Sequence, residues 1–178
     1  MKIIKFLKQI VYRLRGEDSL DSAIKRGLRC GVNCTVTGKI DFGSEPYLIT
    51  LGDNVRMSGD VRFVCHDGGS WVFRRSGKYK DIVHYGKIVI GDNCFIGTRA
   101  IIMPDVIIGD NCVIGAGSIV TRSIPSNSVV VGIPARIIMT TDEYAEKMKE
   151  KMPKNWNEQE LRINKRAYLE RMFYEKEE

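Results

Sequence analysis

A six-residue repeat from Ile90 to Pro125 constrains this chain more than any other feature. It divides without a slip into the blocks IGDNCF, IGTRAI, IMPDVI, IGDNCV, IGAGSI and VTRSIP. Every block opens with an aliphatic residue, and the fifth place of the first five holds Cys94, Ala100, Val106, Cys112 and Ser118. A period of six is too short for a helix-pair or propeller repeat and does not match a heptad. The pattern therefore predicts a parallel β-helix, an all-β solenoid of short strands.

Three blocks would make one turn of about eighteen residues. Because neighbouring strands lie about 4.8 Å apart, we expect the two IGDNC segments to stack one turn apart, with Cys94 over Cys112. The spacing of six also occurs earlier, in Cys30, Val36 and Phe42 and, in a shifted frame, in Leu51, Met57 and Phe63. The sequence predicts about four to five turns over residues 28–138, with residues 44–50 absorbing the shift.

Composition narrows the class of protein. At 178 residues and 43% hydrophobic content, we expect one ordinary domain with its own core. Five cysteines without a signal-peptide pattern argue against a disulfide framework, and Cys34, Cys94 and Cys112, at the small inward place of the repeat, are expected to be reduced core residues of a cytoplasmic protein. The excess of 28 Lys and Arg over 22 Asp and Glu favours anionic partners, but no nucleic-acid-binding motif accompanies it. No apolar run approaches the length of a membrane span.

The first 27 residues form an N-terminal helical segment in this interpretation. Residues 2–15 are amphipathic, with lysines and arginines opposite an apolar arc. They are expected either to pack on the solenoid or a neighbouring subunit, or to make a peripheral contact with an anionic membrane. A second short helix is predicted from Ser19 to Arg26, ended by Gly27.

A helical extension is predicted over residues 139–178. Thr140 and Glu143 have the spacing of a capping box for a helix to about Lys151, and Asn157 is expected to open a second helix that runs to the C-terminus.

The repeat breaks after Phe63 and resumes at Ile90, and the inserted loop, residues 66–87, is the most distinctive segment. It holds both histidines of the chain, His66 and His84, together with several aromatic and basic residues. Because solenoids carry function on loops that leave one face, we expect the functional site here.

The repeats, followed by IGAGSIVTRSIP and VVVGIPARII, closely resemble the hexapeptide-repeat acyltransferases, also called the isoleucine-patch or left-handed β-helix family. The resemblance covers roughly residues 28–138. It implies a left-handed coil, a homotrimer with active sites between subunits, and acetyl-CoA as acyl donor. The chain is most similar to the sugar O-acetyltransferases of the maltose, galactoside and capsular type, and HDGGSWVFR is similar to the surface-polysaccharide branch.

The resemblance implies direct acetyl transfer to a hydroxyl of a sugar or surface-polysaccharide precursor. A hydroxyl needs a base, and His66, which follows a regular coil, is the predicted general base, with His84 as the fallback. Glycines 68 and 69 would let a substrate approach closely. The predicted acceptor contacts are Asp67, Trp71, Arg74, His84 and Tyr85. A loop that instead packs against the adjacent subunit is the competing interpretation.

Family similarity also implies a set of donor-binding residues. The pantetheine is expected along coil backbone near Gly97, Thr98, Ala116 and Gly117. Phe95 occupies a position often held by Trp in the family, Thr121 and Arg122 match a Thr-Lys pair, and Arg136 lies in the terminal Pro-Ala-Arg signature. Either arginine could grip a phosphate of CoA.

Three alternatives remain open from the sequence. The acceptor could be an amino sugar, a nucleotide sugar or an antibiotic, with N- or O-transfer. The chain could be a non-catalytic scaffold. A zinc-dependent carbonic anhydrase on the same solenoid would need three histidines, and this chain has two, so no metal is expected.

Overall fold

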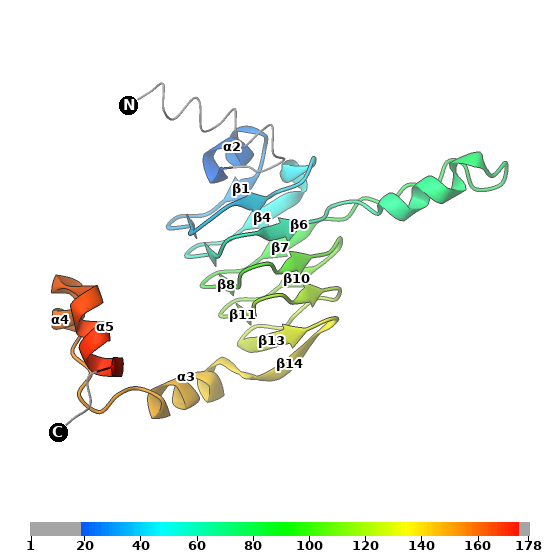
Figure 1. The fold of residues 1–178 in the computed structure, drawn as a ribbon. Coiled ribbons are helices and arrows are strands. Elements are labelled where there is room, and N and C mark those ends of the chain that lie inside the picture. Colours follow the sequence, from blue (N-terminus) through cyan, green and yellow to red (C-terminus); the bar gives the residue numbers. More distant parts are fainter. Residues whose placement is uncertain (1–18, 175–178) are drawn as a thin grey trace. The chain divides into compact units, whose positions relative to one another are not determined.

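A computed structural model describes residues 19–174 of the chain. Its strands fall into three parallel sheets that the chain visits in rotation, which is the topology of a solenoid (Figure 1). The first sheet holds β1 (Arg29–Cys30), β4 (Ile49–Leu51), β7 (Ile88–Ile90) and β10 (Ile107–Ile108). The second holds β2 (Thr35–Val36), β5 (Arg56–Met57), β8 (Phe95–Ile96), β11 (Val113–Ile114), β13 (Ser128–Gly132) and the antiparallel β14 (Ala135–Thr140). The third holds β3 (Ile40–Asp41), β6 (Val61–Phe63), β9 (Ile101–Ile102) and β12 (Ile119–Val120).

The repeat determines which side chains form the core. The block openers from Ile90 to Val120 are at most 1% exposed, and the small fifth-place residues at most 2%. Phe95 pairs in register with Val113, so Cys94 lies next to Cys112 in the stack. The predicted inward positions and the predicted cysteine stack are confirmed. Four strands in the first sheet agree with the predicted number of turns.

The Gly-Asp-Asn corners of the repeat have a structural explanation. The Asp92 carboxylate accepts the backbone N–H of Asp53 at 2.8 Å, and Asp110 does the same for Asp92. The asparagines that follow have positive φ, 53° at Asn93 and 55° at Asn111, a conformation that Asn tolerates better than most residues. Their amides bond to each other at 2.8 Å. These corner residues therefore hold successive coils together.

Helices precede and follow the solenoid. Helix α2 (Leu20–Lys25) is capped by the Ser19 side chain, and Gly27, whose φ is +101°, follows its C-cap residue Arg26. The predicted short helix before Gly27 is confirmed. Helix α3 (Thr141–Glu150) begins with the predicted capping box: Glu143 N–H donates to Thr140 Oγ1 at 3.2 Å, and Thr140 N–H to Glu143 Oε2 at 2.7 Å. The amphipathic segment predicted over residues 2–15 lies outside the described residues.

From Ala145 on, the described residues form a separate compact unit. The single helix predicted after Asn157 is divided into α4 (Glu158–Ile163) and α5 (Lys165–Tyr174). Asn164 is the break: it ends α4 with non-helical backbone, and its side-chain oxygen accepts the N–H of Ala167 at 3.2 Å. Tyr168 is buried in this unit, against the ring of Trp156. Within residues 19–174, no helix has the length and apolar character needed to cross a bilayer.

Candidate active site

The inserted segment leaves the solenoid between β6 and β7, and its two limbs are joined at the base (Figure 1). His66 and Tyr85 form an antiparallel bridge. The N–H of Asp67 donates to the carbonyl of His84 at 3.0 Å, and the N–H of Gly86 donates to the carbonyl of Cys65 at 2.8 Å. We call residues 65–67 and 84–86 the neck of the insertion. Both histidines lie in this neck.

His66 is paired with a carboxylate of the preceding coil. Its Nδ1 lies 3.0 Å from Oε2 of Glu45, in the corner between β3 and β4. The side chain of Glu45 is only 12% exposed, whereas that of His66 is 44% exposed. A largely buried carboxylate thus contacts one ring nitrogen, and the rest of the imidazole is accessible to solvent.

The electrostatics of Glu45 determine which nitrogen of His66 carries hydrogen. Burial disfavours ionisation of Glu45, but the hydrogen bonds with His66 and Ser44 and the charge of His66 outweigh it, so the pKa of Glu45 lies below its ordinary value of 4.5. At neutral pH Glu45 is a carboxylate and only accepts hydrogen bonds, so Nδ1 of His66 must donate. The neutral imidazole then has its lone pair on Nε2, the arrangement of a general base.

The second histidine has a similar but more exposed partner. Nε2 of His84 lies 2.7 Å from Oδ2 of Asp105, and the two side chains are 52% and 61% exposed. Ion pairs at such exposed positions contribute about 0.2–1 kcal/mol. Because the Glu45 side chain is 12% exposed and that of Asp105 is 61% exposed, the geometry favours His66 over His84 as the oriented base.

Cys65, the residue before His66 in the sequence, has a buried thiol. Burial and the charge of Glu45 raise the pKa of Cys65 to about 11, and the residue is 2% exposed. The thiolate is the nucleophilic form of cysteine, and it is scarce at neutral pH when the pKa is this high. The arrangement therefore does not support an acyl-enzyme on Cys65.

The insertion presents the predicted acceptor residues in different ways. Trp71 and Arg74 lie exposed on the 3-10 helix Gly68–Arg75, which Asp67 caps by accepting the N–H of Gly69 at 2.8 Å. Tyr85 is exposed, and its ring centroid lies 5.8 Å from that of His66. Of the predicted acceptor residues, Tyr85 thus places its ring next to the candidate base, whereas Asp67 caps the 3-10 helix.

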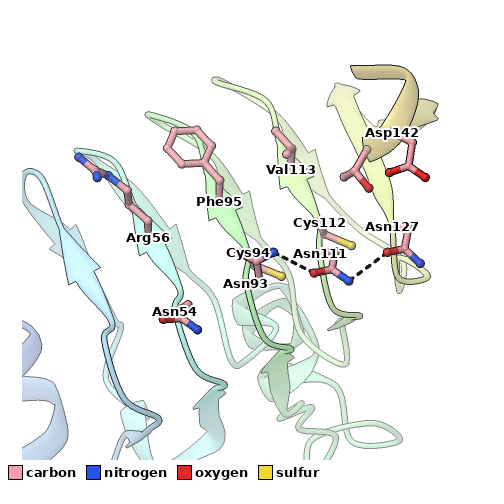
Figure 2. A pocket seen from close by; sticks show the side chains of 11 residues that line it. Asn54, Arg56, Asn93, Cys94, Phe95, Asn111, Cys112, Val113, Asn127 and Asp142 are labelled. Carbon is pink, nitrogen blue, oxygen red and sulfur yellow. Dashed lines mark hydrogen bonds between the residues drawn. The ribbon is translucent and has the colours of Figure 1, made fainter. Parts of the chain in front are cut away.

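An open groove of about 600 Å³ follows the outer face of the second sheet. Figure 2 shows Arg56, Phe95 and Val113 in one row on successive strands, with a second row of asparagines beside them. Thr141 and Asp142, at the start of α3, complete the lining. Phe95, predicted to contact the donor, thus lines a groove together with a guanidinium group that the sequence analysis did not single out.

The predicted donor glycines lie at the corner between the second and third sheets. The N–H of Gly97 donates to the carbonyl of Ile114 and that of Gly117 to the carbonyl of Thr98, both at 2.8 Å. A Cβ atom on Gly97 would lie 2.6 Å from the backbone nitrogen of Ala116. Close packing between coils therefore accounts for the glycine at position 97, and the amides of Gly97 and Gly117 already donate to a neighbouring coil.

The remaining predicted donor residues lie on exposed parts of the chain. Thr121 and Arg122 directly follow β12, and Arg136 lies in β14 with its guanidinium donating to the carbonyl of Ala135 at 2.9 Å. His66, by contrast, belongs to the corner between the third and first sheets. One copy of the chain does not bring the candidate base and the predicted donor corner together.

Glu45 and Asp105 are the residues that sequence reasoning missed. Glu45 precedes His66 by 21 positions, the same offset that pairs Ile40 with Val61 in the third sheet. The length of the first coil was therefore a signal that could have identified Glu45. Among the described residues, no cluster of three or more His, Cys, Asp or Glu side chains is arranged to hold a metal ion.

Comparisons with known proteins agree with this architecture. Residues 87–122 match the family model described as bacterial transferase hexapeptide (six repeats). Protein CapG of Staphylococcus aureus is 46% identical over 134 residues, which cover 74% of this chain and 77% of CapG. Galactoside O-acetyltransferase of Escherichia coli K12 is 41% identical over 100 residues, covering 53% of this chain and 45% of that enzyme.

A solved structure extends the comparison to the fold. The maltose O-acetyltransferase of Clostridium difficile 630 has 26% sequence identity and a TM-score of 0.50, with 75% of this chain and 87% of that chain covered. The repeat, the three parallel sheets and these relatives lead to one conclusion: the chain belongs to the hexapeptide-repeat acetyltransferases.

Proposed function

We propose that the protein transfers the acetyl group of acetyl-CoA to a hydroxyl of a carbohydrate, such as a surface-polysaccharide precursor. The observation that carries this proposal is the buried Glu45 carboxylate 3.0 Å from Nδ1 of His66, which orients the other ring nitrogen as a base. The relatives named as galactoside and maltose O-acetyltransferases support the substrate class.

The chemistry follows from the tautomer of His66. Nε2 removes the proton of the acceptor hydroxyl while the hydroxyl oxygen attacks the thioester carbonyl. Glu45 stabilises the imidazolium that forms, because its carboxylate accepts the Nδ1–H. The tetrahedral intermediate collapses by breaking its carbon–sulfur bond, and the imidazolium returns the proton to the CoA sulfur. The products are an acetyl ester and CoA, and His66 is again neutral.

We further propose that the active site forms between two copies of the chain in a homotrimer with the left-handed coil of the family. His66 lies at one corner of the solenoid, whereas Gly97 and Ala116 lie at another, and Phe95 lies on a face. A neighbouring copy can supply the donor corner to the His66 of the first. Arg122 and Arg136 are exposed cations that would hold phosphates of CoA in this arrangement.

The test measures turnover of acetyl-CoA with a panel of hydroxyl and amino acceptors. Release of the CoA thiol is the readout. His66→Gln should lower kcat by about 100- to 10,000-fold, because general-base catalysis is lost. Unchanged turnover in this variant would eliminate the mechanism. Amino acceptors preferred over their hydroxyl counterparts would instead favour N-transfer to an amino sugar or an antibiotic.

A further inference from the structure

The neck of the insertion is anchored to the solenoid on both sides by histidine–carboxylate contacts. His66, on the outgoing limb, contacts Glu45 of the preceding coil at 3.0 Å. His84, on the returning limb, contacts Asp105 of the following coil at 2.7 Å. Asp105 lies between β9 and β10, a corner equivalent to that of Glu45 between β3 and β4. Each limb therefore has its own side-chain attachment to a different coil.

Backbone contacts connect the two limbs of the neck. The carbonyl of His84 accepts the N–H of Asp67, and Tyr85 forms the bridge to His66. The ring of Tyr85 lies 5.8 Å from the imidazole of His66, with an angle of 51° between the planes. A displacement of His84 would therefore move Tyr85, which is both the bridge partner and the ring neighbour of His66.

The corner on the solenoid side is closely packed. A Cβ atom on Gly86 would lie 2.5 Å from the backbone nitrogen of Asp105 and 2.6 Å from its Oδ1, so the returning limb passes directly against this residue. Asp105 itself has a positive φ of 61°. Only a glycine at position 86 lets the limb approach closely enough for His84 to reach the carboxylate.

The small free energy that the His84–Asp105 contact contributes to folding indicates a role in positioning, not in stability. Both side chains are more than half exposed, and pairs of this kind contribute about 0.2–1 kcal/mol to folding. Catalysis is more sensitive to geometry, since a misplacement of about 1 Å can cost about 100-fold in rate. Loss of a contact that barely changes stability can thus still change turnover.

We propose that His84 is a positioning residue: by donating Nε2–H to Asp105 it holds the returning limb so that Tyr85 stays against His66. This inference rests on the proposed function, in which His66 is the base. His84 does not touch the reacting atoms in this account. Its contribution is the placement of His66 relative to the acceptor hydroxyl.

The experiment compares His84→Ala with His84→Gln, measuring kcat and both KM values by thiol release from acetyl-CoA. The alanine variant removes the donor, and kcat should fall about tenfold through misplacement of His66. The KM for acetyl-CoA and the thermal midpoint should stay near those of the unchanged protein. The glutamine variant retains an N–H donor at similar reach and should recover most of kcat.

Variants of Asp105 test the same contact independently, from the side of the acceptor. Asp105→Asn keeps an acceptor and tolerates positive φ, so it should behave like the unchanged protein. Asp105→Gly fits the same backbone but removes the acceptor, and it should reproduce His84→Ala. The double variant His84→Ala with Asp105→Gly should lose no more than either alone, because both remove one contact.

Different outcomes separate the two proposals. Unchanged kcat in both His84→Ala and Asp105→Gly would overturn the positioning role and leave the His66 mechanism intact. Additive losses, or a thermal midpoint that falls in parallel with kcat, would also overturn it, since they indicate a structural effect. Activity abolished in His84→Gln but retained in His66→Gln would make His84 the base and overturn both proposals.

Discussion

The carboxylate of Glu45 lies one coil from His66 and contacts its Nδ1 at 3.0 Å. Their offset of 21 positions matches the pairing of Ile40 with Val61, so the contact follows from the register of the third sheet. The solenoid thus positions a catalytic candidate, because its register brings a largely buried carboxylate into contact with His66.

Glu45→Gln should lower kcat by about 10- to 100-fold, since the imidazolium loses its neighbouring charge and the tautomer of His66 is no longer imposed. The KM for acetyl-CoA should change little, because Glu45 contacts His66 and the donor residues lie at another corner. Steady-state kinetics with saturating acceptor measure this.

Asp41→Asn is the matched control for Glu45→Gln. Asp41 is also a carboxylate of the first coil, but it pairs with Arg62 at the surface, and asparagine retains the oxygen that accepts the N–H of Gly43. Its kcat should equal that of the unchanged protein. Equal losses in the two variants would contradict a specific role for Glu45.

The pH dependence of stability offers a second test of the same contact. The folded pKa of Glu45 is lowered from 4.5, so its contribution to the free energy of unfolding is complete above 4.5 and is lost as the pH falls through the lowered value. The difference between the unchanged protein and Glu45→Gln should therefore shrink on acidification through this range. Urea unfolding at a series of pH values measures it, and a difference independent of pH would contradict the assigned ionisation.

Sequence reasoning was sufficient for the parallel coils of the solenoid, because a six-residue period with aliphatic first places is typical of a β-helix. The openers from Ile90 to Val120 had to be buried, and Cys94 had to stack next to Cys112. The capping box of Thr140 and Glu143 was equally local, since its two contacts span three residues.

The candidate site was harder to predict from the sequence, because its contacts join different coils. Glu45 and Asp105 lie in corners whose sequences have no unusual feature, and only the register brings them next to His66 and His84. The break at Asn164 was missed for another reason: a side-chain cap can interrupt a helical pattern without Pro or Gly.

Gly97→Ala should destabilise the solenoid. The added methyl would meet the backbone nitrogen of Ala116 at 2.6 Å, where no flexible side chain can move aside. Overpacking of this kind costs about 1–3 kcal/mol, which should appear as a lower thermal midpoint in a calorimetric scan.

Gly68→Ala is the control for Gly97→Ala. Its added methyl would meet nothing within 4 Å and its φ is not positive, so the thermal midpoint should stay or rise slightly. If the two variants melted at the same temperature, the proposed crowding at the corner of Gly97 would be wrong.

Cys65→Ala tests direct transfer against an acyl-enzyme. Cys65 directly precedes His66 in the sequence, but its pKa of about 11 keeps it protonated, so its removal should leave kcat nearly unchanged. A loss of about 1 kcal/mol in stability is expected from the small cavity. Mass spectrometry after mixing with acetyl-CoA should find no acetylated protein; an acetylated species absent from Cys65→Ala would establish the covalent route.

Trp71→Ala tests whether the insertion holds the acceptor. Trp71 presents an exposed indole on the 3-10 helix, close in sequence to Arg74, and such a face can stack on a sugar ring. Loss of about 1 kcal/mol of stacking corresponds to about a fivefold increase in the acceptor KM, while the KM for acetyl-CoA should not change. Val72→Ala removes an equally exposed apolar side chain from the adjacent position and should leave both constants unchanged. If Trp71→Ala altered neither KM nor kcat for any glycosyl acceptor, the insertion would have to serve packing between subunits instead.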